Sequence, residues 1–132
     1  MRADFSADFY NMITFLQTYE HRNGSIECRT GSFQLGRATG HTEVLKSTVK
    51  RLKAEGNDVM VVGLKCNQDG CDVTYDKFTR GEIFRGHRNF PDVIIFECFS
   101  HPNVPIGHVY ETIADIECRV RGRSKPVYFK VQ

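Results

Sequence analysis

Residues 92–99 read Asp-Val-Ile-Ile-Phe-Glu-Cys-Phe, the most strand-like stretch of the chain. Its β-branched and aromatic side chains favour an extended backbone, and Phe90-Pro91 immediately before it marks a boundary. A second apolar run at residues 58–65, Asp-Val-Met-Val-Val-Gly-Leu-Lys, predicts another buried strand. The fold is therefore expected to be built on a sheet with these two strands in it.

Further strands are predicted before, between and after these two runs, because short apolar stretches there are bounded by turn residues. They cover residues 25–29, 32–35, 72–78, 116–120 and 126–131. The last two are interpreted as a hairpin across residues 121–125, and residues 109–115 fit either a short helix or part of a strand.

Two amphipathic helices are predicted ahead of the long strands. Residues 4–21 carry large apolar side chains at helical spacing, and residues 42–55 begin at a Thr42 N-cap and end before Gly56. The chain is thus expected to be an α+β protein, with two helices packed on a small mixed or antiparallel sheet. Residues 1–132 are expected to form a single globular domain.

Composition excludes several classes of protein. The net charge is +2 at pH 7, and no apolar run is long enough for a membrane span. The start of the chain does not have the apolar core of a secretion signal, and five cysteines are an odd number. We therefore expect an intracellular protein, cytoplasmic or nuclear, with reduced thiols and no membrane partner.

A zinc site is the first candidate for chemistry. Cys66 and Cys71 are separated by four residues, with a glycine just before the second thiol, and Cys98 and His101 have Cys-x2-His spacing. Thiolates and imidazoles at such spacings can converge on a tetrahedral Zn²⁺, with His87 as a reserve ligand. Core packing of the same cysteines is the competing interpretation.

A basic run is the second candidate. Arg119, Arg121, Arg123 and Lys125 lie in the predicted hairpin, and there is no acidic residue between them. Strand alternation would send the three arginines to one side, where they could contact nucleic-acid phosphates. The competing interpretation is a solvated hairpin tip.

Two weaker patterns involve acids and glycines. Asp92 and Glu97 resemble the PD-(D/E)xK nuclease pattern, which implies Mg²⁺ held by carboxylates, although Phe99 stands where that pattern has lysine. Residues 36–40, Gly-Arg-Ala-Thr-Gly, could present backbone N–H groups to an anion ahead of the second helix. They do not end in the Lys-Ser/Thr of a phosphate-binding loop, so a plain connector is the favoured interpretation.

No complete catalytic constellation is present, so the sequence favours a non-enzymatic binding module over an enzyme. The expected partner is nucleic acid or another protein, with a structural zinc as a brace. A metal-dependent nuclease and a metal-free protein–protein adaptor stay as alternatives, the adaptor using the aromatic first helix.

Overall fold

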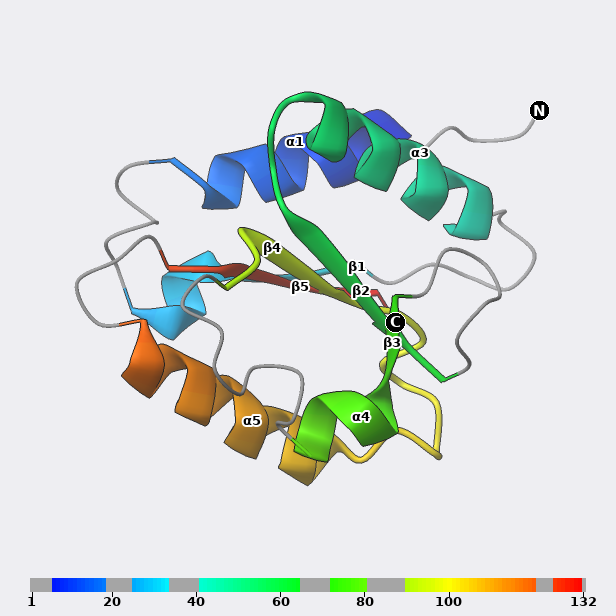
Figure 1. Cartoon of the computed structure of the whole chain (residues 1–132). Helices are drawn as coiled ribbons and strands as arrows, with labels where there is room; N and C mark the ends of the chain where they lie inside the picture. Colours follow the sequence, from blue (N-terminus) through cyan, green and yellow to red (C-terminus); the bar gives the residue numbers. More distant parts are fainter. Residues whose placement is uncertain are drawn as a thin grey trace.

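The computed structural model describes residues 6–18, 25–33, 41–64, 72–80, 90–120 and 125–131, with the backbone alone for residues 6–8, 33 and 41–44. The elements in this part of the chain are α1 (Ser6–Leu16), η1 (Ile26–Arg29, a 3-10 helix), β1 (Thr30–Phe33), α3 (His41–Ala54), β2 (Val59–Gly63), β3 (Val73–Thr74), α4 (Tyr75–Arg80), β4 (Val93–Phe96), α5 (Ile106–Arg119) and β5 (Val127–Val131). The strands form one sheet in the order β1-β5-β4-β2-β3, and every neighbouring pair is parallel (Figure 1).

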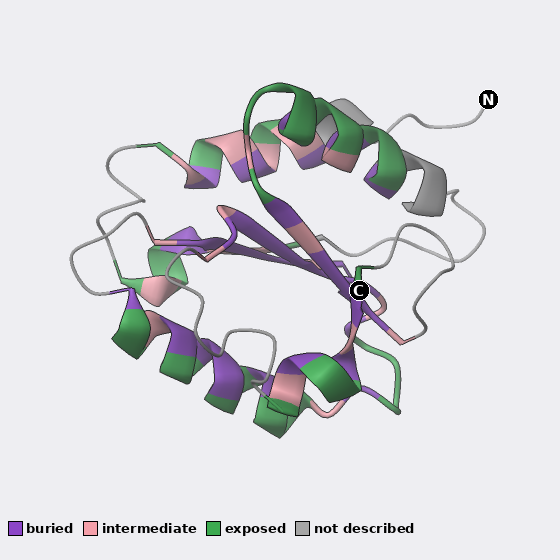
Figure 2. Ribbon diagram, in the orientation of Figure 1, coloured by how far each residue is buried: buried purple, intermediate pink, exposed green. Residues whose placement is uncertain are grey.

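The predicted α+β fold with a mixed or antiparallel sheet is therefore wrong, and the protein is an α/β protein with helices on both faces. The physical reason is visible in β4, where all four residues are buried. Val93 and Ile95 belong to the core that also holds residues of α1 and α3, whereas Ile94 and Phe96 belong to the core with residues of α4 and α5. A strand buried on both sides is typical of parallel sheets, and Figure 2 shows the strands largely buried between the helices.

The order of the strands determines which helix covers which face. The chain runs from β1 at one edge across to β2, and then returns from β3 through β4 to β5. Connections between parallel strands are right-handed. A connection that moves across the sheet in one direction therefore places its helix on one face, and a connection that moves in the opposite direction places its helix on the other face. Accordingly α1 and α3 lie on one face and α4 and α5 on the other (Figure 1).

The hairpin predicted over residues 116–120 and 126–131 is wrong. The first part lies in α5 or directly after it, and β5 pairs with β1 and β4 in parallel. The buried side chains of α5 are Val109, Thr112, Ile113 and Ile116, a spacing of three and four residues. The short helix that was one interpretation of residues 109–115 is therefore confirmed, and it continues into residues that were assigned to the hairpin.

Other local predictions have mixed outcomes. The helix expected at 42–55 is confirmed as α3, the one expected at 4–21 is α1, and the strands expected at 58–65 and 92–99 are β2 and β4. The strand expected at 25–29 is a 3-10 helix, and the one expected at 72–78 is a two-residue strand followed at once by α4. Among the helices of this described part, none is long and apolar enough to cross a membrane.

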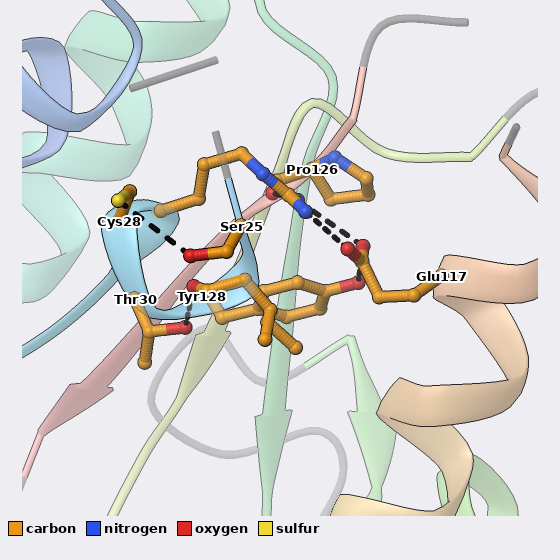
Figure 3. A network of polar contacts seen from close by, with 8 residues as sticks. Ser25, Cys28, Thr30, Glu117, Pro126 and Tyr128 are labelled. Carbon is orange, nitrogen blue, oxygen red and sulfur yellow. Dashed lines mark hydrogen bonds and ion pairs between the residues drawn. The ribbon is translucent and has the colours of Figure 1, made fainter. Parts of the chain in front are cut away.

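A buried ion pair joins the end of η1 to α5 and β5. The Arg29 side chain is fully buried, forms an ion pair with Glu117, and donates to the carbonyl oxygen of Pro126 at 2.7 Å. The Tyr128 hydroxyl donates to the same Glu117 carboxylate at 2.8 Å (Figure 3). This network ties together residues nearly a hundred positions apart, and it lies near the amino-terminal end of β5.

The network predicts a loss of stability in alkali. Burial, and then the charge of the Glu117 carboxylate, raise the pKa of Tyr128. The native protein therefore keeps the Tyr128 proton at a pH where the unfolded chain releases it, from about pH 10 upward. The free energy of unfolding should fall as the pH rises from 9 to 11, and less steeply in Tyr128→Phe. Urea titrations across this range test the prediction, and equal slopes for both proteins would contradict it.

Candidate functional site

The five strands of the described residues all end at one edge of the sheet, because they are parallel. Phe33 at the end of β1 pairs with Val131 at the end of β5. The chain beyond β4 continues this row: the Glu97 N–H donates to the carbonyl of Val62 at 2.8 Å, and the Phe99 N–H donates to the carbonyl of Val131 at 2.9 Å. Neighbouring strands are about 4.8 Å apart, so the ends of β1 and β4, two strands apart, are separated by roughly 10 Å.

Glu97 is an acidic side chain at this carboxyl edge, and it is buried, with 8% of its surface exposed. Val93 and Ile95 pack in the core shared with α1 and α3, and Glu97 has the same strand parity. Glu97 lies in the turn directly after β4, and the alternation of the strand, continued by one residue, would place it on the face that α3 covers. α3 begins at His41, directly after the connection from β1, so its N-terminal end belongs to the same edge and face.

The turn that carries Glu97 is held from three sides. Cys98 has a φ of 51°, which few residues other than glycine adopt, and this sharp bend turns the chain out of β4. The backbone contacts to β2 and β5 hold the residues on either side of Cys98. The buried Tyr75 hydroxyl donates to the Glu97 carbonyl at 2.6 Å. Glu97 is thus positioned by rigid elements and not by a loose loop.

A cleft of about 830 Å³ lies at the same edge but on the side of α4 and α5. Leu64, Thr74 and Tyr75 line it from the ends of β2 and β3 and the start of α4. His101, Asn103 and His108 line it from the connection between β4 and α5 and from the first turn of α5. In open α/β sheets, ligands bind in crevices outside the carboxyl ends of the strands, where the chain changes direction along the sheet.

The predicted zinc ligands are only partly described. Cys98 and His101 lie in one turn, where the His101 N–H donates to the Cys98 carbonyl at 2.9 Å. Cys66, Cys71 and the reserve ligand His87 lie outside the described residues. Among the residues that the structure does describe, no three His, Cys, Asp or Glu side chains form a metal-binding group. The zinc site stays a prediction.

The predicted phosphate contacts do not share a strand. Arg119 is the last residue of α5, and its guanidinium pairs with Asp115 at 3.2 Å. Lys125 is half-buried and lines a hollow of about 300 Å³ together with Asp92 and Val127, which lie at the amino ends of β4 and β5. Arg121 and Arg123 lie outside the described residues. The alternation on which the basic patch rested does not apply to Arg119.

The two acids of the nuclease pattern lie at opposite ends of β4. Asp92 precedes the strand, and its carboxylate accepts the Asp58 N–H at 2.9 Å, whereas Glu97 follows the strand. Five residues of strand span roughly 16 Å, which is far more than two ligands of one Mg²⁺ can be apart. The fold therefore does not bring this pair together.

The residues that sequence reasoning undervalued are those around the connection from β1 to α3. The signal was a strand, a glycine-containing stretch and a helix in immediate succession, together with a second apolar strand that ends in an acid. No family model, curated protein or solved structure matches this chain. The fold and the carboxyl edge define the class of protein: a parallel α/β domain with helices on both faces and candidate ligand sites where its strands end.

Proposed function

We propose that this protein is a nucleotide-binding domain that holds the phosphates of a Mg²⁺–nucleoside triphosphate between the end of β1 and the start of α3. The observation that carries the proposal is the succession of strand, glycine-containing connection and helix N-terminus, with the buried Glu97 at the same edge of the sheet. Phosphate-binding loops have this order of elements, in which backbone N–H groups and the helix dipole attract the anion.

The sequence supports the proposal at several positions. Gly40-His41-Thr42 resembles the end of the phosphate-loop motif G-x4-G-K-[S/T], and residues 34–40, which include both glycines, lie outside the described residues. Thr42 is the hydroxyl residue that would contact Mg²⁺, and Glu97 would supply the acid at the end of the neighbouring apolar strand. Hydroxyl and carboxylate oxygens are the ligands that Mg²⁺ prefers.

The sequence departs from the motif at two positions. Leu35 stands where the first glycine of the motif would be, and Gly36 follows it. His41 stands in place of the lysine that contacts the β- and γ-phosphates. An imidazole is mostly neutral at pH 7, so it offers less charge to the phosphates than an ammonium group. We therefore propose nucleotide binding, of modest affinity, and not rapid hydrolysis.

Binding of the phosphate chain itself tests the proposal. ATP and inorganic tripolyphosphate should both bind in the presence of Mg²⁺, compete with one another, and bind more weakly when Mg²⁺ is chelated. Isothermal titration calorimetry measures each of these. AMP should bind more weakly than ATP, because it does not have the β- and γ-phosphates. Absence of ATP and tripolyphosphate binding at millimolar concentration would refute the proposal.

The nucleic-acid and protein partners expected from the sequence stay untested predictions. Their strongest support was the basic hairpin, which does not form, so we do not place a partner on residues 119–125. A gel-shift titration at two salt concentrations tests nucleic-acid binding directly, because each phosphate contact steepens the salt dependence.

A further inference from the structure

The cleft on the side of α4 and α5 is distinct from the proposed phosphate site, which lies on the α3 face. Its volume, about 830 Å³, is in the range of small-molecule sites. The described residues that line it include no lysine or arginine, and the acidic residue Asp76 forms an ion pair with Arg80. Among the described residues, the lining therefore offers a phosphate no lysine or arginine side chain, and an uncharged ligand suits this lining better.

The hydrogen bonds of two histidines show what the cleft offers to such a ligand. The Asn103 N–H donates to His101 Nδ1 at 3.1 Å, so Nδ1 has no hydrogen and Nε2 carries it. His108 Nδ1 is 3.3 Å from the Glu111 carboxylate, which only accepts, so this Nδ1 carries the hydrogen. In the neutral rings, His101 therefore presents a donor at Nε2 and His108 an acceptor at Nε2.

The remaining groups extend this complementary pattern. Asn103 also lines the cleft, and its side-chain amide has two N–H donors and one carbonyl acceptor. Thr74 accepts the Lys77 N–H, which leaves its hydroxyl hydrogen to be donated. Leu64 and Pro105 supply apolar surface, and imidazole rings stack on flat heterocycles. Paired donors and acceptors on a flat, uncharged ring are the features of a nucleobase edge.

We propose that this cleft binds the base of a nucleoside through His101, Asn103 and His108. The base comes from either a free nucleoside or an unstacked base of single-stranded nucleic acid, since both present the same edge. This site does not depend on the proposed phosphate site.

Titration with adenosine and uridine tests the proposal, because neither nucleoside carries a phosphate. We expect saturable binding that shifts the NMR signals of the His101 and His108 rings. His101→Ala and Asn103→Ala should each weaken binding about fivefold, the effect of one hydrogen bond of about 1 kcal/mol. Asn11→Ala, an exposed asparagine on α1, is the matched control and should leave the affinity unchanged.

Oligonucleotides distinguish the two sources of the base. The base belongs to a single strand if single-stranded octamers bind more than tenfold more tightly than the nucleosides and if the same variants lower the affinity for the octamers. If octamers bind no more tightly, it belongs to a free nucleoside. The His108 side chain is 72% exposed, so His108→Ala gives a second variant should the others unfold.

The proposal is overturned if no nucleoside or octamer shows saturable binding, or if all three cleft variants bind as well as the unaltered protein. Its failure is separable from failure of the phosphate site. Excess Mg²⁺–tripolyphosphate should not displace adenosine from the cleft, and adenosine should bind whether or not tripolyphosphate does.

Discussion

Glu117→Gln is expected to lower the free energy of unfolding by about 3 kcal/mol, the lower end of the cost of breaking a buried ion pair, because the Glu117 side chain is 19% exposed. The Arg29 side chain is 1% exposed, and a guanidinium keeps its charge at any pH a protein tolerates. Glutamine preserves the shape of Glu117 but leaves this buried cation without its counter-charge. Urea unfolding followed by circular dichroism measures the difference.

The matched control is Glu111→Gln on the same helix. Glu111 pairs with His108, and both side chains are more than 70% exposed, so the change should cost no more than about 0.5 kcal/mol. The double variant Arg29→Met/Glu117→Leu should recover part of the loss, because it removes the buried Arg29 charge together with its counter-charge. The prediction would be contradicted if the free energy of unfolding of Glu117→Gln lay within about 1 kcal/mol of that of the unaltered protein, because about 1 kcal/mol is the cost of losing an ordinary hydrogen bond.

His41→Lys is expected to raise the affinity for Mg²⁺–ATP by about tenfold or more, since a charge-assisted contact to phosphate contributes about 1.5–3 kcal/mol. The change completes the Gly-Lys-Thr ending of a phosphate-binding loop at residues 40–42. A gain in affinity cannot come from misfolding, which makes this a sharper test than a loss. Calorimetric titration with ATP, with and without Mg²⁺, measures it.

Two further variants complete this test. Cys118→Lys adds a charge of the same sign at an exposed position near the end of α5, outside both proposed sites, and should alter ATP affinity little at physiological salt, where charges are screened within about 8 Å. Thr42→Ala should weaken binding only when Mg²⁺ is present, because its proposed role is to contact the metal. Equal ATP affinities for His41→Lys, Cys118→Lys and the unaltered protein would count against the phosphate site.

Local signals in the sequence predicted several elements well. α3 was located to within one residue at each end, and Gly56, with a φ of 92°, follows its end as predicted. The helix begins at His41, so Thr42 lies inside it and is not the N-cap that the sequence predicted. β2 and β4 were identified from their apolar runs. The error at α5 came from reading residues 116–120 together with 126–131 as a hairpin, although Val109, Ile113 and Ile116 already form a helical stripe.

The parallel sheet was also signalled, but weakly. Val93, Ile94, Ile95 and Phe96 are apolar at four consecutive positions, as expected for a strand with a core on each side. A strand of an antiparallel sheet with one solvent-exposed face would instead alternate apolar and polar residues. The run was recognised as a buried strand, yet the sequence does not specify which strands become its neighbours.

The sequence by itself determined where the helices and strands that have strong local signals would form, and which residue types were available for chemistry. Only the tertiary structure decided that Phe33, Val131 and Glu97 end in one row, that Asp92 lies at the opposite end of β4 from Glu97, and that Arg119 belongs to a helix. The physical reason is that helix caps and apolar periodicity act over a few residues. Strand order and register, in contrast, depend on burying both faces of the sheet through contacts between residues as many as 98 positions apart, as between Thr30 and Tyr128.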